Sequence, residues 1–480
     1  MPWATNGFCS RLDVVVSVKR ARIECIVCRT CSVRAKISAK RSRAASVAAE
    51  QARSSSATAI VEACGPAWYG SGSVRERVVI TGIGCISSFG LGHAALADAV
   101  ASGASGISAI TAFDTSACRS HLAATIRGFD PAAFIPPMKL RRFDAVSRVA
   151  VASARLLFEH ARREVGPGAA DDVGIALGTY TAGLDSVVEY VGGLTDHGPT
   201  GVPAILFSNT VSNAPASLCA IEFGLRGPNV TFNLREASSP AAIAFAVGVV
   251  RDRRAAAMVC GGADCVEETF FKVHDRFRAL SPMRDGDEGA RPFDRRRNGY
   301  VLGEGGYLLL LEAKSAAERR GAQPYGEVLG VGAAASAAAM NDWPADRSGV
   351  VRAMRLALKD AGLAADDVGA VVAASNGAPR LDKLESDAIA EVFGARAVPV
   401  ASVKGAVGES GAAAAAGIVL ALRSMAEGSV VPTVGLAEPD PECAVAASGA
   451  SQAVVSETFQ VNAVACGGTA YSLAIRAARA

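Results

Sequence analysis

RVVITGIGCISSFGLG, residues 77–92, is the segment that decides the fold of this chain. It begins as a short run of β-branched apolar residues and ends in a glycine-rich turn. The sequence that follows, HAALADAVASG at 93–103, has helical periodicity. A buried strand, a glycine turn and a helix in this order are typical of an α/β layer fold.

A second copy of this opening occurs later in the chain. GEVLGVGAAASA, residues 326–337, repeats its pattern of apolar and glycine positions. The letters AADDVG also occur twice, at 169–174 and 364–369, and each copy precedes an apolar run of the kind found in sheets covered on both faces. Two repeated segments that occur in the same order predict a duplicated α/β unit. We expect its halves at residues 76–320 and 321–480.

The composition indicates a globular body with a separate N-terminal extension. The 480 residues are 50% hydrophobic, which is enough to bury a large core. Residues 1–75 are rich in Arg, Ser and Ala and hold 12 Lys and Arg against 4 Asp and Glu. Their composition is typical of a transit peptide or of a start codon assigned too early, so we expect little order there. The remainder holds 37 basic against 42 acidic residues, which predicts no nucleic-acid partner.

The cysteines and the apolar runs favour a reduced, cytoplasmic protein without a membrane span. Cys25, Cys28 and Cys31 form a C-x-x-C-x-x-C run, but no fourth ligand follows at a suitable spacing, so we expect no metal. The seven cysteines of the main body are scattered singly through apolar sequence, as buried thiols are. The alanine-rich run at 411–422 is too short to cross a bilayer and predicts a buried helix.

Several motifs together resemble the β-ketoacyl-acyl carrier protein synthases. They are GPNVTFN at 227–233, ARPFDRRRNGYVLGEGG at 290–306 and NAVACGGT at 462–469, and the resemblance runs in register over 77–480. It implies a thiolase-like fold, in which two similar βαβ halves form a five-layered α/β/α/β/α sandwich that is normally dimeric. It also implies a place in fatty-acid or polyketide biosynthesis, with acyl carrier protein as the partner and no cofactor.

The chemistry of that family needs three side chains that this chain lacks. In the family, a cysteine at a helix N-terminus carries the acyl chain as a thioester, two histidines promote decarboxylation of the malonyl thioester, and backbone amides hold the oxyanion. The resemblance places Glu236 at the cysteine position and Ala374 and Glu409 at the two histidine positions. The last histidine of the chain is His274, so no choice of register restores a histidine to the second half.

The residues that support the site in the family are retained. The resemblance places Lys404, Asp382 and Glu385 where the family keeps a lysine and acids that order the active-site loops, and Glu304 lies in the retained GEG. We expect these to make structural ionic contacts, whose loss would leave buried partners unpaired. Their retention favours a maintained fold.

The last loop departs from the family pattern. The aromatic gate of the acyl tunnel becomes Val464 and Cys466. A relocated nucleophile at Cys466 is one interpretation, because thiolases of the same superfamily use a cysteine before a glycine pair. A thiolase would also need its own nucleophilic cysteine and a G-H-P histidine, which are absent. A small packing residue is the simpler interpretation.

Glu236 has two interpretations of its own. One is a helix-capping acid, paired with Arg235, that fills the old thiol pocket. The other is a general base, or a mimic of a polarised acyl group that assists decarboxylation. A carboxylate cannot form the exchangeable thioester that condensation requires. Ser238 and Ser239 lie nearby but lack an adjacent histidine to activate them.

The pattern is most similar to the chain length factors, ketosynthase-like subunits that lack the nucleophile and pair with an active ketosynthase. Those subunits usually carry glutamine where this chain has Glu236. The leading hypothesis is therefore a condensation-incompetent subunit in a hetero- or homodimer with a ketosynthase. The alternatives are an acyl-thioester decarboxylase or hydrolase that uses Glu236 or Glu409, and a pseudoenzyme that binds acyl chains or carrier protein.

Overall fold

The computed structural model describes residues 76–284, 287–394 and 396–478. The N-terminal extension, with Cys25, Cys28 and Cys31, lies outside the described residues.

The first half of the chain contributes five main strands to one sheet. They are β1 (Val78–Ser87), β5 (Val173–Gly178), β6 (Asn229–Phe232), β7 (Ala257–Asp264) and β9 (Gly305–Ala313). Their spatial order is β1-β9-β7-β5-β6. β9 is antiparallel to both of its neighbours, whereas β7, β5 and β6 are parallel to one another.

The second half repeats this arrangement in five strands, and β14 (Ala446–Ala447) pairs with the last of them as an additional edge strand. Its strands are β10 (Gly326–Ala335), β11 (Ala370–Val372), β12 (Pro399–Ala401), β16 (Thr458–Val464) and β17 (Thr469–Ala477). They lie in the order β10-β17-β16-β11-β12, with β17 antiparallel to both neighbours and β16, β11 and β12 parallel. The two AADDVG copies precede β5 and β11, which hold the same place in the two halves. The predicted duplication is confirmed.

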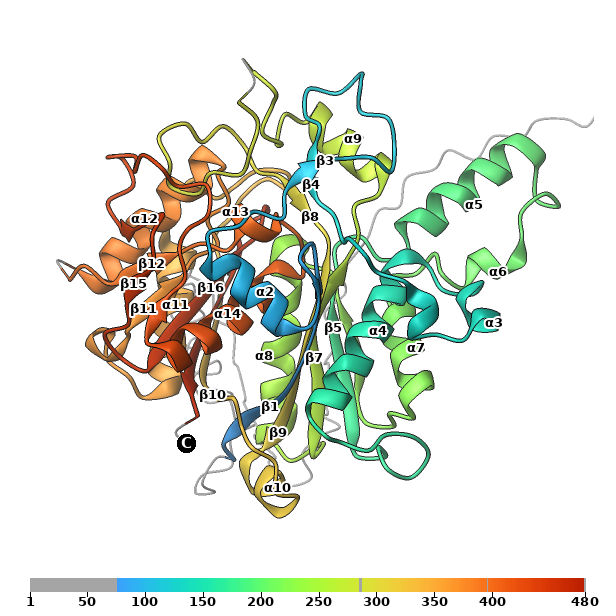
Figure 1. The fold of residues 1–480 in the computed structure, drawn as a ribbon, viewed down its shortest axis with the longest axis horizontal. Coiled ribbons are helices and arrows are strands. Elements are labelled where there is room, and N and C mark those ends of the chain that lie inside the picture. Colours follow the sequence, from blue (N-terminus) through green and yellow to red (C-terminus); the bar gives the residue numbers. More distant parts are fainter. Residues whose placement is uncertain (1–75, 285–286, 395, 479–480) are drawn as a thin grey trace, which may run out of the picture. The chain divides into compact units, whose positions relative to one another are not determined.

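Antiparallel pairing of β1 with β10 joins the halves into a 12-stranded sheet among the described residues. Helices cover both halves and lie between them (Figure 1). The outer helices are α4 (Ala145–His160) and α7 (Ala214–Phe223) on the first half, and α11 (Ser348–Ala361) and α12 (Pro379–Phe393) on the second. Between the halves lie α8 (Ser238–Arg251) and α14 (Ala413–Glu427). These five layers are the predicted thiolase-like sandwich.

The middle layer contains the largest apolar cluster. Ile243 of α8 and Ile418 of α14 are fully buried there against strands of both halves. The alanine-rich run lies in α14, whose residues from Ala413 to Leu422 are all buried, as predicted. The remaining elements are short or peripheral: β2 (Gly90–Leu91), α2 (His93–Ala101), β3 (Ser108–Ala109), β4 (Leu122–Ala124), η1 (Pro131–Ala133), α3 (Pro137–Leu140), α5 (Leu184–His197), α6 (Ala204–Phe207), η2 (Arg235–Ala237), α9 (Glu268–Arg276), β8 (Leu302–Gly303), α10 (Lys314–Arg319), η3 (Ala365–Asp367), α13 (Lys404–Val407), β13 (Ser429–Val430), β14 (Ala446–Ala447) and β15 (Gln452–Ala453).

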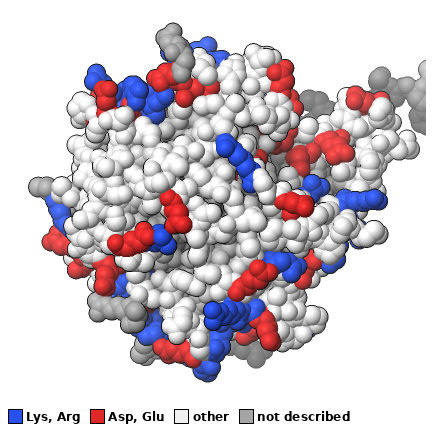
Figure 2. Space-filling model, in the orientation of Figure 1, with Lys and Arg blue, Asp and Glu red and all other residues white. Residues whose placement is uncertain are grey.

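The surface and the cysteines agree with the composition. On the face shown in Figure 2, Lys and Arg side chains are interspersed with Asp and Glu, and no continuous basic stripe crosses it. All seven cysteines among the described residues are free, and five of them are buried. In the part of the chain that the structure describes, no helix has the length and apolar character needed to cross a bilayer.

The repeated G-x-G has the same physical reason in both halves. A Cβ atom on Gly84 of β1 would lie 1.9 Å from the Ser153 carbonyl oxygen of α4, and one on Gly332 of β10 would lie 1.9 Å from the Ala353 carbonyl oxygen of α11. The register also shifts at the same place, just before Gly82 against β9 and just before Gly330 against β17. The glycines therefore let a helix lie directly on the first strand of each half.

Replacing either glycine should weaken the fold to a similar degree. We expect Gly84→Ala and Gly332→Ala each to lower the free energy of unfolding by about 3 kcal/mol, because the helix must move away from the strand. Denaturant unfolding followed by circular dichroism measures this. Gly248→Ala is the control, since a Cβ there meets nothing within 4 Å inside α8, and it should leave stability unchanged or slightly raised. Equal effects at all three positions would contradict the packing argument.

Candidate active site

A sharp turn presents Glu236 at the start of α8. Arg235 has a φ of +56°, in the left-handed region, where the chain turns from β6 into η2. The Ser238 hydroxyl fastens this turn, because it donates to the Arg235 carbonyl oxygen at 2.6 Å and accepts from the Leu234 amide at 2.9 Å. Glu236 is only 2% exposed. Ser239 lies next to it in α8, with a buried hydroxyl that has no hydrogen-bond partner.

The Glu236 carboxylate reaches across to the second half of the chain. Its Oε2 accepts a hydrogen bond from the Cys466 amide at 3.1 Å, while its Oε1 is buried without a partner. The helix-capping interpretation is wrong in its geometry, because α8 begins at Ser238 without a side-chain cap. The pairing with Arg235 is loose, with 3.9 Å between the Arg235 Nε and the Glu236 Oε2.

The surroundings hold Glu236 partly protonated near neutral pH. Burial and the nearby charge of Glu409 raise the pKa of Glu236 to about 7, against the opposing effects of Arg235 and of the Cys466 amide. In acyl transfer, backbone amides beside the nucleophile hold the oxyanion. Here the Cys466 amide already donates its hydrogen bond to the Glu236 carboxylate.

Glu409 is held by three donors. Its Oε1 accepts from the Lys404 ammonium group and from the Ser410 amide at 3.0 Å, and its Oε2 accepts from the Asn376 side-chain amide at 2.7 Å. Lys404 and Glu409 are both buried. Glu409 is therefore fixed in an ion pair, and both of its carboxylate oxygens already accept hydrogen bonds from the protein.

Ala374, at the other histidine position, brings only a methyl group. It is 4% exposed, and its amide donates to Glu385 at 2.9 Å. Glu385 also accepts from the amide and the hydroxyl of Ser375, each at 2.7 Å, and from the Asn462 side chain at 3.1 Å. Both oxygens of this buried acid are thus used to fix the loop after β11.

The expected ionic contacts are mostly hydrogen bonds to backbone amides. Asp382 accepts from the amides of Phe293, Asn376 and Gly377 at 2.8, 3.0 and 3.2 Å. Glu304 accepts from the amides of Ile126 and Val266 at 2.7 and 3.0 Å. Lys404 makes an ion pair within hydrogen-bond distance, with Glu409, and Asp382 lies 4.0 Å from the Arg297 Nε. A buried acid that accepts several backbone amides orders the loop that carries them.

Two cavities meet at this site. The inner one has a volume of about 10 Å³ and is lined by both Glu236 and Glu409, so it has room for about one water molecule. The outer one has a volume of about 480 Å³, which is the size of a small-molecule site. Arg235 and Cys466 line the outer cavity. Ala374 and Val464 line neither of them.

The two predicted gate residues therefore differ in their positions. Val464 is 2% exposed at the end of β16, within an apolar cluster that contains residues of both halves. Cys466 faces the outer cavity, but burial and the charge of Glu236 raise its thiol pKa far above the ordinary value of 9.0. A thiol that stays protonated is a poor nucleophile, which favours the packing interpretation of Cys466.

Sequence reasoning missed the aromatic wall of the outer cavity, including a histidine from the first half. His274 of α9 lines this cavity. Its Nδ1 lies 2.8 Å from the Phe270 carbonyl oxygen, so Nδ1 carries the proton and Nε2 faces the Tyr180 hydroxyl at 3.4 Å. Burial lowers the pKa of His274, so the ring is neutral. No motif marks Tyr180 or His274, because the spacing between them is set by the fold.

Comparison with known proteins identifies the family to which this fold belongs. The family model for the N-terminal domain of β-ketoacyl synthases matches residues 75–316, and the C-terminal domain model matches residues 325–437. The chain belongs to the β-ketoacyl synthase family. The family makes 3-oxoacyl products on acyl carrier protein in fatty-acid or polyketide synthesis.

Individual relatives come from both kinds of pathway. The 3-oxoacyl-[acyl-carrier-protein] synthase 2 of Coxiella burnetii is 31% identical over 77% of this chain and 90% of its own length. The tetracenomycin polyketide synthase ketoacyl synthase alpha subunit of Streptomyces glaucescens is 34% identical over 77% of this chain and 89% of its own length. Among solved structures, the ishigamide ketosynthase/chain length factor has a TM-score of 0.79 and 28% identity, and the match covers 85% of this chain and 100% of that one.

The buried Glu236 should make stability fall as pH rises. Because the folded state holds its proton up to about pH 7, while an ordinary glutamate loses it near 4.5, stability declines between these values and is flat above them. We expect Glu236→Gln to be more stable than the wild type at pH 8, by up to about 3 kcal/mol, and equal to it at pH 4.5. Thermal unfolding of both proteins from pH 4.5 to 8 measures this. A difference that does not change with pH would contradict the assignment.

Removing one partner of the Lys404–Glu409 ion pair should lower the free energy of unfolding. Lys404→Met leaves a buried carboxylate without its cation, so we expect a loss of about 3–5 kcal/mol in the free energy of unfolding. The double variant Lys404→Met/Glu409→Gln should recover most of this loss. Lys383→Met, which breaks a half-buried pair with Asp387 on the surface of α12, is the control and should lose less than about 1 kcal/mol. Failure of the double variant to recover would contradict a role for the buried charge.

Proposed function

We propose that this chain is a condensation-incompetent subunit, similar to a chain length factor, that pairs with an active ketosynthase and acts beside acyl carrier protein in the cytoplasm. One observation carries the proposal: Glu236, which the resemblance places at the position of the nucleophile, is buried and accepts a hydrogen bond from the Cys466 amide. This group fills the place where a thioester and its oxyanion would form. It cannot exchange an acyl chain with a carrier thiol.

The two positions that the resemblance gives to the histidines support the same proposal. Ala374 has no group that could bind a malonyl carbonyl, and Glu409 is already committed to Lys404 and Asn376. The inner cavity of about 10 Å³ leaves no room for an acyl chain at Glu236. The hydrogen bonds of Glu385 and Asp382 to backbone amides support an ordered site.

The surface of the first half supports a partner subunit. Among the described residues, β6 ends the sheet and has one unpaired edge, which proteins normally cover. The helices near this end of the body carry exposed apolar side chains, and α5 and α6 stand away from the sheet (Figure 1). These side chains are Val188, Val191, Leu194, Ile205, Phe207, Val211 and Ile221. Together they fit a surface that is buried against a second ketosynthase-like chain.

Co-expression with an intact ketosynthase tests the proposal. We expect a heterodimer on size exclusion and native mass spectrometry, and a change in product chain length when the subunit is present. Phe207→Asp should abolish the heterodimer, because it puts a charge on a residue that is 65% exposed in the free chain and buried in the complex. Val455→Asp is the matched control, at a residue that is 61% exposed in the second half, and should leave assembly intact. A chain that stays alone or pairs only with itself, and leaves product length unchanged, would overturn the proposal.

A second candidate function rests on the protonation state of Glu236. A carboxylate with a pKa of about 7 and one free oxygen is suited to general-base catalysis, as in a decarboxylase or a hydrolase of acyl thioesters. Incubation of the pure protein with malonyl carrier protein tests this. Release of CO2 or of free malonate that is lost in Glu236→Ala would favour this function over the first one. Retention of an acyl chain without turnover, seen by native mass spectrometry, would favour an acyl-binding pseudoenzyme.

A further inference from the structure

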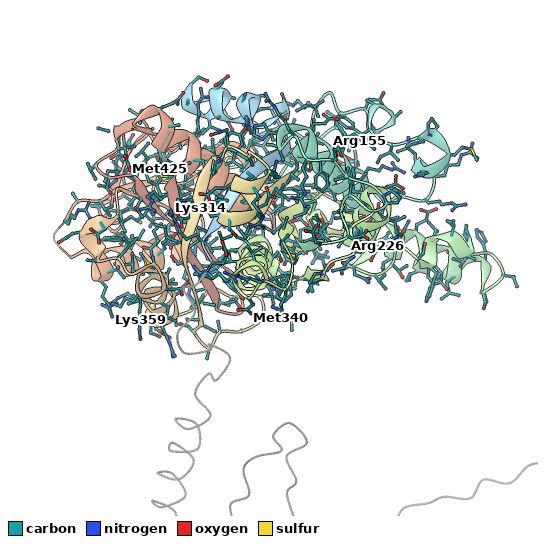
Figure 3. All side chains as sticks on the ribbon, turned by 90° about the horizontal axis from the view of Figure 1, so that it is seen from below. Arg155, Arg226, Lys314, Met340, Lys359 and Met425 are labelled. Carbon is teal, nitrogen blue, oxygen red and sulfur yellow. The ribbon has the colours of Figure 1, made fainter. Side chains whose placement is uncertain are left out.

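Residues 184–208 form an arm that leaves the body of the chain and returns to it. The arm contains α5 and α6, and it extends away from the sheet in Figure 1 and past the labelled Arg226 in Figure 3. Between Ser186 in its first turn and Asn209 directly after it, no residue is buried. Burial in the body therefore contributes little to holding the arm in place, because apolar packing fixes a segment only where side chains are removed from water.

The two ends of the arm meet at one point. Gly183, directly before the arm, has a φ of +81°, and a Cβ atom there would lie 2.7 Å from the Asn209 carbonyl oxygen. The chain before this point is fixed, since the amides of Tyr180 and Thr181 donate to the buried Asp264 at 2.7 and 2.9 Å. Any movement of the arm therefore takes place about the point where Gly183 meets Asn209.

Two acids bind the entry of the arm to the start of α4. Asp144, which caps α4 through the Ser147 amide at 2.9 Å, also accepts from the Gly183 amide at 3.1 Å. Asp185, in the first turn of α5, accepts in return from the Ala145 amide at 3.1 Å. Each acid thus bonds to a backbone amide at the start of the other acid's helix. Hydrogen bonds from amides to carboxylates are among the stronger ones in proteins.

The exit of the arm is bound to the same place by a side-chain amide. Asn209 is 7% exposed, and its Nδ2 donates to the Arg142 carbonyl oxygen at 2.9 Å. Arg142 lies two residues before Asp144 in the chain. Both ends of the arm are therefore bonded to residues 142–145.

We propose that Asp144, Asp185 and Asn209 act as a clasp that fixes the direction of the arm, and that the clasp preorders the arm's apolar side chains for a partner subunit. The second part rests on the proposed function, and the first part does not. An apolar surface that is already in place loses less conformational freedom when it is buried, so a fixed arm should bind more tightly than a swinging one. The exposed apolar side chains on α5 are spaced three residues apart along one face of the helix: Val188, Val191 and Leu194.

Hydrogen exchange of the full-length chain alone, followed by mass spectrometry, tests the clasp without a partner. Asp185→Ala should make the amides of residues 187–208 exchange about tenfold faster or more, because it removes the acceptor of the Ala145 amide, while α8 and α14 exchange as before. Asp185→Asn keeps a side-chain acceptor oxygen and should restore most of the protection. Glu189→Ala is the matched control, since it removes an exposed acid of α5 outside the clasp and should leave exchange unchanged.

A second variant acts at the other end of the arm and leaves α5 untouched. Asn209→Ala should also speed exchange of residues 187–208, because it removes the donor to the Arg142 carbonyl oxygen. Asn213→Ala is its control, at an exposed asparagine whose side chain makes no capping hydrogen bond. Unchanged exchange of the arm in both Asp185→Ala and Asn209→Ala would overturn the inference. An equal loss of protection in α8 and α14 would also overturn it, because the clasp would then stabilise the whole fold.

Assembly with an intact ketosynthase separates this inference from the proposed function. When the wild-type chain forms the heterodimer, both clasp variants should bind the ketosynthase about tenfold or more weakly, although they keep every exposed apolar side chain of the arm. Equal affinity of the wild type and both variants would overturn the preordering of the surface. Faster exchange of the arm in the variants of a chain that assembles with no ketosynthase would support the clasp and contradict the proposed function alone.

Discussion

The antiparallel pair of β1 and β10 is the contact on which the rest of the structure depends. Three residue pairs, Val78 with Val328, Val79 with Glu327 and Ile80 with Gly326, join two sheets that otherwise repeat each other. This junction sets the two halves around α8 and α14. The candidate site exists only because of it, since Glu236 comes from the first half while Glu409 and Cys466 come from the second.

The same junction explains how a buried acid can persist where a thiol is expected. Glu236 alone would be a costly charge in a nearly closed pocket. The second half offsets part of that cost with the Cys466 amide, and a raised pKa removes part of the charge at neutral pH. Glu409 is stabilised differently, by a full ion pair and an amide donor. The site thus holds two neighbouring acids by two separate mechanisms.

Much of the fold could be predicted from the sequence, because its signals are local and repeated. The G-x-G pairs of β1 and β10 and the AADDVG copies before β5 and β11 mark equivalent strands, and the structure gives those strands the same order and direction. The positions of Glu236 and Glu409 in one pocket follow from that register. The bond from Cys466 to Glu236 does not, since 230 residues separate the two and no pattern marks an amide. The aromatic wall with His274 was missed for the same reason, and the ionic role expected for Glu385 and Asp382 depends on loop amides that no motif specifies.

Under the proposed function, Glu236, Ala374 and Glu409 would not be equivalent obstacles to condensation. A thiol at position 236 would regain the Cys466 amide as an oxyanion donor, but it would still lie next to the fixed Glu409 carboxylate, which raises the pKa of neighbouring acids. A histidine at position 409 would displace that charge and leave the Lys404 ammonium buried without its partner, which disfavours the protonated form of both groups. A histidine at position 374 would need space that a fully packed strand end does not provide, since Ala374 is 4% exposed and lines neither cavity. Each of the three side chains is thus part of the packing or charge balance of its neighbours. No single substitution would therefore restore the site that the resemblance implies.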